Sequence, residues 1–188
     1  LRAPEVYGNY MSLKEVVAPD DPSFKKMPPF MSSSKNQDII RFDDILLYKA
    51  EALIELNREM EALPLINQVR ERAINSTDLL KQADNSPASN YHMDIYKPGV
   101  NCNWTKDFAR QALQWERKLE FSMEGWRFFD LVRWGIAAET LNAYFAREKT
   151  RRPHLNTAHF QKNKDEYWPI PLNQINYSSG LYEQNPGW

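Results

Sequence analysis

The sequence is poor in the residues that bind metals and form covalent cross-links. It has one cysteine, Cys102, which excludes an intrachain disulfide and a cysteine-rich zinc site. Its three histidines show no metal-site spacing, and neither a His-Glu-x-x-His nor a Glu-x-x-His motif occurs. Glycine-rich phosphate loops and Gly-x-Ser-x-Gly nucleophile motifs are also missing. We therefore expect neither a metal nor a cofactor.

Long apolar runs and a charge excess are absent as well. No apolar stretch reaches the 18 or so residues of a membrane-spanning helix, and the first residues do not resemble a signal peptide. The formal net charge is -1, so we expect no nucleic-acid partner. The chain begins with Leu rather than Met, which is typical of a piece of a longer protein.

Aromatic residues, in contrast, are abundant, at 13% of the chain. Many lie in residues 115–135, WERKLEFSMEGWRFFDLVRWG, where they alternate with acids and arginines. This stretch is too aromatic for one apolar stripe, so some charges must lie at the edge of the core, where only paired charges are tolerated. Spacings of three and four residues predict a structural ion-pair lattice, with these members: Glu116, Glu120, Glu124, Arg127, Asp130 and Arg133.

Paired carboxylates also allow a second interpretation of this stretch. A carboxylate-dependent hydrolase would use Glu120 or Glu124 in an open cleft. The neighbouring arginines are expected to lower the pKa values of these acids, whereas a general acid needs a raised pKa. We therefore favour ion pairing over catalysis and predict that the protein is not an enzyme.

Helical spacing predicts two antiparallel helices in residues 43–73. Asp43 is the expected cap of the first helix, which ends near Asn57. The second begins near Met60 or Glu61. Large and small apolar residues alternate along the pair, as they do in a tetratricopeptide hairpin.

Further helices are predicted after residue 104. Thr105 is the expected cap of the next one. Its buried face is predicted to carry these residues: Phe108, Ala112, Trp115, Leu119 and Ser122. A helical pattern resumes after Gly125 and continues, with a pause at Gly135, to about Lys149. The predicted fold class is mainly α, a tetratricopeptide-like hairpin packed with further helices, long irregular loops and an extended, Pro-rich C-terminal segment.

Two regions interrupt the helical pattern. Residues 1–38 are rich in Pro and Ser and are predicted to form an irregular arm or variable segment that precedes a helical domain over residues 39–188. Residues 75–104 are polar and lack a sustained period, and long irregular loops often bind ligands. The candidate stacking residues on this loop are Trp104, Tyr96 and Tyr91. An alternative role for Trp104 is to pack as a staple onto the following helix.

Three blocks of the sequence, taken in this order, resemble the C-terminal region of the SusD/RagB family. The first begins at Arg41 with RFDDILLYKAEA and continues in the INQVRERA segment. The second comprises the Glu-Arg, Glu-Phe and Glu-Gly pairs and the DLVRWG segment of residues 116–135. The third contains Trp168-Pro-Ile-Pro and the terminal Gln-Asn-Pro-Gly-Trp.

The resemblance implies a nutrient-binding outer-membrane lipoprotein that captures oligosaccharide without catalysis. Its implied partners are a TonB-dependent transporter of the SusC type and the missing N-terminal part of the same protein, which would carry the lipid anchor on the extracellular face. The residues alone leave another function open, in which the helical hairpin of residues 43–73 is a protein-interaction module without a small-molecule site.

Overall fold

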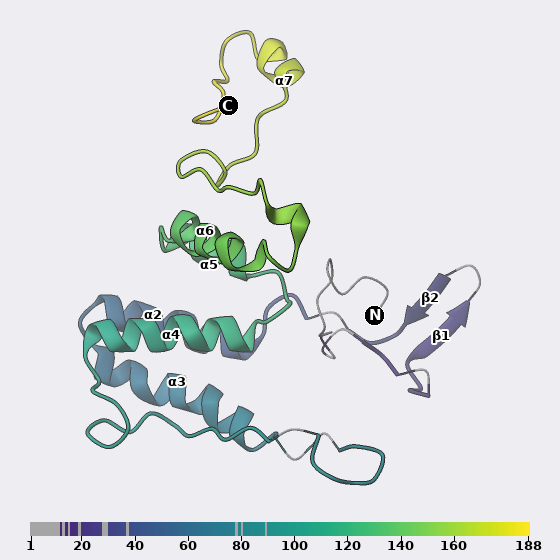
Figure 1. Ribbon diagram of the computed structural model, residues 1–188, viewed down its shortest axis with the longest axis vertical. Coiled ribbons are helices and arrows are strands. Elements are labelled where there is room, and N and C mark those ends of the chain that lie inside the picture. Colours follow the sequence, from purple (N-terminus) through teal and green to yellow (C-terminus); the bar gives the residue numbers. More distant parts are fainter. Residues whose placement is uncertain are drawn as a thin grey trace. The chain divides into compact units, whose positions relative to one another are not determined.

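The computed structural model describes residues 12, 14, 16–18, 20–27, 30–36, 38–77, 79, 81–88 and 90–188. These residues form two compact units, residues 12–124 and residues 125–188, and both are mainly helical (Figure 1). The predicted fold class is therefore confirmed. None of the helices in the described ranges is long and apolar enough to cross a bilayer. The predicted single domain over residues 39–188 includes residues of both units, and it stays a prediction.

Part of the predicted N-terminal arm, residues 1–11 above all, lies outside the described residues. The described part contains an antiparallel hairpin of β1 (Phe24–Met27) and β2 (Phe30–Ser33), in which Phe24 is opposite Ser33. The sequence did not predict this hairpin because each strand has four residues. An alternating pattern is hard to recognise over so short a segment.

Three helices make up most of the first unit. They are α2 (Phe42–Glu55), α3 (Glu59–Ile74) and α4 (Lys106–Glu120), and each packs against the other two. Their shared core holds these buried apolar residues: Leu47, Ala50, Leu53, Ile54, Ala62, Ile66, Val69, Ala109, Ala112 and Leu113. The α2–α3 hairpin is the predicted tetratricopeptide-like pair.

The two ends of α2 have different capping interactions. Arg41 precedes the helix, and Asp43 lies in its first turn, so the predicted cap at Asp43 is wrong. The Asp43 carboxylate instead accepts a hydrogen bond from the Arg41 guanidinium. At the other end, Asn57 has a φ of 59°, and the Arg58 and Asn57 amides donate to the carbonyls of Leu53 and Ile54 at 2.8 and 3.1 Å. This is the Schellman arrangement, which ends a helix with one left-handed residue.

Helix α4 begins as predicted but buries a different face. The Thr105 hydroxyl accepts a hydrogen bond from the Phe108 amide at 3.3 Å, which confirms the cap. Trp115 and Leu119, however, are each 55% exposed, so their predicted burial is wrong. The buried face carries three charged residues beside its apolar ones, namely Glu116, Arg117 and Glu120.

Arg117 is the central buried charge. Its Nη1 donates to Asp44 Oδ1 of α2 at 2.8 Å, and its guanidinium lies 4.3 Å from the centre of the Tyr48 ring. The side chain of Arg117 is 0% exposed and that of Asp44 is 5% exposed. This ion pair joins α4 to α2 in the solvent-excluded interior, where either charge alone would destabilise the fold.

The acids of α4 bind arginines that come from elsewhere in the chain. Glu116 pairs with Arg70 of α3. Glu120 accepts from Arg41 Nη1 at 2.9 Å and also pairs with Arg72 of α3. Glu124, which follows α4, accepts from Arg41 Nη2 at 2.8 Å. These acids therefore attach α4 to α3 and to the residue that precedes α2.

Burial sets the protonation chemistry of two of these acids. The pKa of Glu116 is raised by burial, which outweighs the lowering effect of Arg70. The pKa of Glu120 is raised by burial and by a hydrogen bond with Asp43, against the opposing effects of Arg41 and Arg72. The prediction that neighbouring arginines lower the pKa of Glu120 is wrong in net direction, because lost solvation exceeds the attraction.

The second unit is built on α5 (Arg127–Arg133) and α6 (Ala137–Glu148). Between them, Gly135 has a φ of 71°, and the amides of Gly135 and Ile136 donate to the carbonyls of Val132 and Leu131. Only a residue that tolerates left-handed φ fits this second Schellman turn, which explains the glycine. Leu131, Ala137 and Phe160 form the local core.

The other three members of the predicted ion-pair lattice lie on α5. Arg133 Nε donates to Asp130 Oδ1 at 3.0 Å, a pair that the three-residue spacing suggests. Arg127 has a different environment, because its guanidinium lies 5.9 Å from the centre of the Trp134 ring. Burial lowers the pKa of Arg127, while Asp130 acts in the opposite direction.

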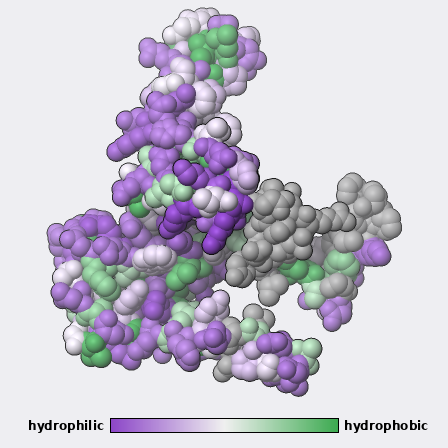
Figure 2. Space-filling model, viewed as in Figure 1, coloured by the Kyte–Doolittle hydropathy of each residue, from purple (hydrophilic) through white to green (hydrophobic). Residues whose placement is uncertain are grey.

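The C-terminal segment consists mostly of turns and irregular backbone, and it contains two short helical turns. These are η1 (Pro153–Leu155) and α7 (Leu172–Tyr177). Hydrophobic residues gather over the segment that carries α7 (Figure 2), where the exposed apolar residues are Leu172, Tyr177, Leu181 and Tyr182.

Side-chain amides hold the irregular segments in place. Asn67 of α3 accepts from the Tyr96 amide at 2.8 Å and donates to the Tyr96 carbonyl at 2.9 Å. Asn142 of α6 binds both backbone groups of Phe160 in the same way, and Gln184 binds both backbone groups of Ile170. Each of these amide clamps replaces the two hydrogen bonds that a neighbouring strand would provide.

Removing the buried guanidinium should unfold the first unit more easily. We expect Arg117→Ala to lower the free energy of unfolding by about 3–5 kcal/mol, because Asp44 is left charged and buried. The matched control is Arg110→Ala on the same helix, whose exposed pair with Glu55 should contribute about 0–1 kcal/mol. Urea unfolding measures both values. Equal losses of unfolding free energy in the two variants would contradict the role of Arg117 as the central buried charge.

The raised pKa of Glu116 should appear in the pH dependence of stability. The native state binds this proton more tightly than the unfolded state, so the contribution is present below the ordinary pKa of 4.5 and is lost as the pH rises through the native pKa. Relative to wild type, Glu116→Gln should therefore gain unfolding free energy as the pH rises across this window. Urea unfolding at a series of pH values measures the difference.

Glu55→Gln is the control of opposite sign. A hydrogen bond from Arg110 lowers the pKa of Glu55, so the wild type gains stability from this group as the pH rises. The variant should lose unfolding free energy relative to wild type over the corresponding range. A shift of the same sign in both variants would rule out the burial effect at Glu116.

Candidate functional site

The long irregular loop of residues 75–104 is anchored to α3 at its second half. The Asn67 clamp fixes Tyr96, and the Arg70 guanidinium donates twice to the Asp94 carbonyl, at 3.0 and 2.7 Å. The same guanidinium lies 4.3 Å from the centre of the Tyr96 ring. One arginine therefore connects the loop, the buried acid Glu116 and an aromatic ring.

The three predicted stacking residues lie in different environments. Trp104 is only 7% exposed, and its Nε1 donates to the Glu59 carbonyl at 2.9 Å. Its ring centre is 5.4 Å from that of Tyr96 and 5.8 Å from that of Phe108. Tyr96 is half-buried within this cluster, and Tyr91 is 73% exposed. Trp104 thus packs as a staple near the start of α4, and Tyr91 presents an open ring.

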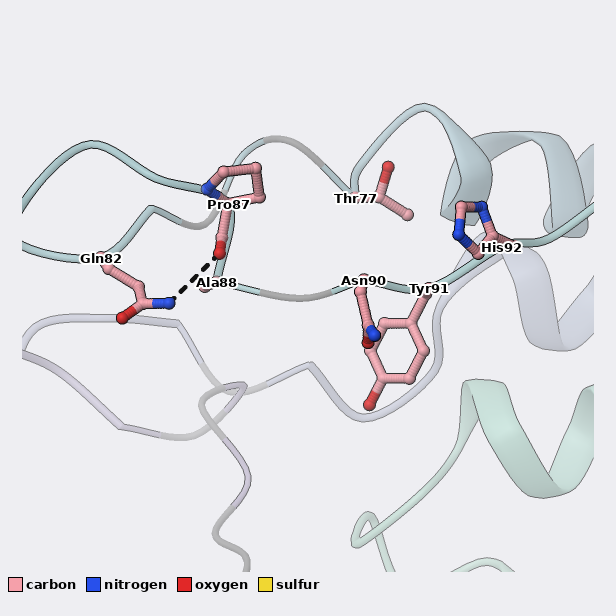
Figure 3. A pocket seen from close by; sticks show the side chains of 7 residues that line it. All are labelled: Thr77, Gln82, Pro87, Ala88, Asn90, Tyr91 and His92. Carbon is pink, nitrogen blue, oxygen red and sulfur yellow. Dashed lines mark hydrogen bonds between the residues drawn. The ribbon is translucent and has the colours of Figure 1, made fainter.

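Tyr91 lines a pocket of about 580 Å³ that is formed by loop residues between 77 and 92 (Figure 3). The lining residues are Thr77, Gln82, Pro87, Ala88, Asn90, Tyr91 and His92. Figure 3 shows Gln82, Pro87 and Ala88 at one end of the pocket and Thr77 and His92 at the other. The volume falls within the range of about 300–1,000 Å³ that is typical of small-molecule sites.

A tight turn shapes one end of this pocket. Asp84 Oδ1 accepts from the amide and the hydroxyl of Ser86 at 2.9 and 2.6 Å. Asn85 has a φ of 66°, and the Gln82 amide donates to the Ser86 carbonyl at 2.9 Å. The Gln82 side chain then donates to the Pro87 carbonyl at 3.3 Å. The turn therefore brings Gln82 and Pro87 together.

The pocket offers hydrogen bonds and one aromatic face, and its described lining residues include no carboxylate, Lys or Arg. Two side-chain amides, two hydroxyls and an imidazole can donate to or accept from a polar ligand. Of these lining residues, the sequence singled out Tyr91. It gave no signal for Thr77, Gln82 or Asn90, because only the turn brings these residues to one place.

The carboxylates considered for hydrolysis lie elsewhere. Glu120 and Glu124 bind the Arg41 guanidinium, and neither lines the Tyr91 pocket. Glu120 is also buried. Within the described part of the chain, no group of three or more His, Cys, Asp or Glu side chains is arranged to hold a metal ion.

Comparison with known proteins shows which family and which relatives the chain is similar to. The model of the SusD family matches residues 8–188. SusD-like protein P38 of Formosa agariphila is 33% identical over 143 residues, which are 72% of this chain and 26% of that protein. SusD-like protein P25 of the same organism is 28% identical over 157 residues, or 84% of this chain and 25% of that protein.

A solved structure shares the fold. The crystal structure of a SusD homologue from Bacteroides thetaiotaomicron has a TM-score of 0.64 and 28% sequence identity to the chain. The match covers 84% of this chain and 28% of that one. The chain thus spans about a quarter of the length of these relatives. The family match over almost all residues, together with the shared fold, shows that the chain belongs to the SusD family.

Proposed function

We propose that the chain is the C-terminal part of a nutrient-binding protein that captures oligosaccharide without catalysis. Membership of the SusD family supports a binding role. The observation that carries the proposal is the Tyr91 pocket, which combines an exposed aromatic ring with hydrogen-bonding groups and has no carboxylate, Lys or Arg among its described lining residues.

Sugar rings match this combination of groups. Their C–H faces are apolar and stack on aromatic rings, while their hydroxyls need both donors and acceptors. Tyr91 would supply the stacking face, and the amides of Gln82 and Asn90 would pair with hydroxyls. Tyr96 and Trp104 would hold the loop in place without contacting the ligand. Tyr96 packs against α4, Trp104 binds the start of α3, and neither lines the pocket.

The resemblance to the SusD/RagB family supports a proposal for where such a protein works. The relatives are about four times longer than this chain, and we propose that an N-terminal part supplies further ligand contacts and the lipid anchor. We place the whole protein at the extracellular face of the outer membrane, beside a SusC-like, TonB-dependent transporter that receives the nutrient.

The interaction module remains a second candidate because of one observation. Helix α2 exposes a set of large apolar residues, namely Phe42, Ile45 and Leu56 at its end. Exposed apolar surface of this kind is typical of a face that a partner covers. If this is the function, Ile45→Glu should abolish binding of the protein partner, and the wild type should bind no oligosaccharide.

Binding is tested by titrating the full-length protein with a panel of neutral oligosaccharides in a calorimeter. We expect Tyr91→Ala to raise the dissociation constant about two- to tenfold, since a stacked ring contact contributes about 0.5–1.5 kcal/mol. Tyr177→Ala is the matched control, because Tyr177 is a similarly exposed aromatic of α7 outside the pocket. Its affinity should equal that of wild type.

Two outcomes would contradict this proposal. One is the absence of heat with every oligosaccharide, together with co-purification of a different ligand. The other is an equal loss of affinity in the Tyr91 and Tyr177 variants, which would move the contact away from the pocket.

A further inference from the structure

We propose that the second unit contains a separate ligand site, which binds an organic cation that carries N–H donors, such as a protonated amine. The site is a cavity of about 530 Å³ within residues 125–188. Its lining residues are Phe128, Phe129, Asp165, Glu166, Tyr167, Trp168 and Trp188. The proposal does not depend on oligosaccharide binding at the Tyr91 pocket.

Hydrogen bonds between two segments hold this cavity in shape. Trp188 Nε1 donates to the carbonyls of Tyr167 and Lys164 at 3.1 and 3.3 Å. Asn185 Nδ2 donates to the Trp168 carbonyl at 2.6 Å, and the Gln184 clamp lies just beyond it. The walls are therefore positioned before any ligand arrives, which reduces the entropy cost of binding.

Gly187 allows the two segments to approach. It has a φ of 83°, and a Cβ at this position would lie 2.8 Å from Lys164 Cβ. No other residue type avoids both the strained backbone and the collision. The terminal Asn-Pro-Gly-Trp sequence therefore has a local physical purpose, which is to hold the Trp188 ring at the cavity.

The walls expose an unusual amount of aromatic surface. Trp168 is 87% exposed, and Phe129, Tyr167 and Trp188 are each at least half exposed. Aromatic faces attract cations through the negative potential above the ring. One wall residue already makes such a contact, because Lys164 Nζ lies 4.5 Å from the centre of the Trp188 ring.

The charge of the lining selects the ligand class. Asp165 and Glu166 are its two charged residues, and within residues 125–188 neither forms an ion pair with Lys or Arg. Asp165 Oδ2 accepts from the Gln161 amide at 2.6 Å. Glu166 Oε2 is buried and has no hydrogen-bond partner among the described residues. Within this unit, both carboxylates line the cavity without a Lys or Arg ion pair, and an ammonium in the cavity would supply the opposite charge together with N–H donors.

The Tyr91 pocket and this cavity therefore differ in the ligand that each suits. The Tyr91 pocket is lined by amides, hydroxyls and an imidazole, whereas this one combines several rings with two carboxylates. An anion would be repelled here, and a neutral molecule would leave both carboxylates uncompensated.

The test uses three probes that share one ring. Benzylamine, benzyl alcohol and benzoate carry a positive, a neutral and a negative group on the same frame. With the full-length protein, NMR or calorimetric titration should show saturable binding of benzylamine, at least fivefold weaker binding of benzyl alcohol and none of benzoate. Added salt should weaken benzylamine binding and leave benzyl alcohol binding almost unchanged.

Two substitutions locate the binding. Glu166→Gln keeps the shape of the side chain and should make benzylamine bind no better than benzyl alcohol. Trp168→Ala should weaken both probes, and it leaves the fold intact because the ring is exposed. Glu139→Gln, an exposed acid of α6 outside the cavity, is the charge-matched control and should change neither.

The proposal is overturned by any of three results. These are no saturable binding of benzylamine, equal affinities for benzylamine and benzyl alcohol in the wild type, and an unchanged ratio of the two in the Glu166 variant. An intact circular dichroism spectrum and melting temperature for each variant show that a lost affinity does not come from unfolding.

Discussion

Buried charge decides how the first three long helices pack. Helix α4 places Glu116, Arg117 and Glu120 on its inner face, and each would be prohibitively costly to bury alone. Their partners are Arg70 and Arg72 on α3, Asp44 on α2 and Arg41 just before it. Because every partner lies at a fixed position, the pairs admit one rotation and one height of α4 against the hairpin.

The sequence predicted the helices of the chain better than their packing. Apolar spacing and the Thr105 cap located α4, and Gly135 marked the end of α5, because these signals depend on neighbouring residues. The buried face was mistaken because Trp115 and Leu119 are more hydrophobic than Glu116 and Glu120. Only partners that are distant in sequence reverse this order, and Arg70 is 46 residues from Glu116.

The same limit applies to the candidate site. The polar, aperiodic composition of residues 75–104 correctly indicated a long irregular loop. Composition could not show that Trp104 donates to Glu59 and is buried, whereas Tyr91 remains open. Thr77, Gln82 and Asn90 line one pocket because the chain turns at Asp84 and Ser86. The composition of the loop does not show which residues such a turn brings together.

The amide clamps have a consequence for how such a chain can diversify. Asn67, Asn142 and Gln184 bind the backbone of Tyr96, Phe160 and Ile170, and not their side chains. The clamped residues can therefore be replaced without loss of the attachment. Insertions between two attachment points lengthen a loop at small entropic cost while its ends stay where they are. A single helical framework can in this way present binding loops of many lengths and sequences.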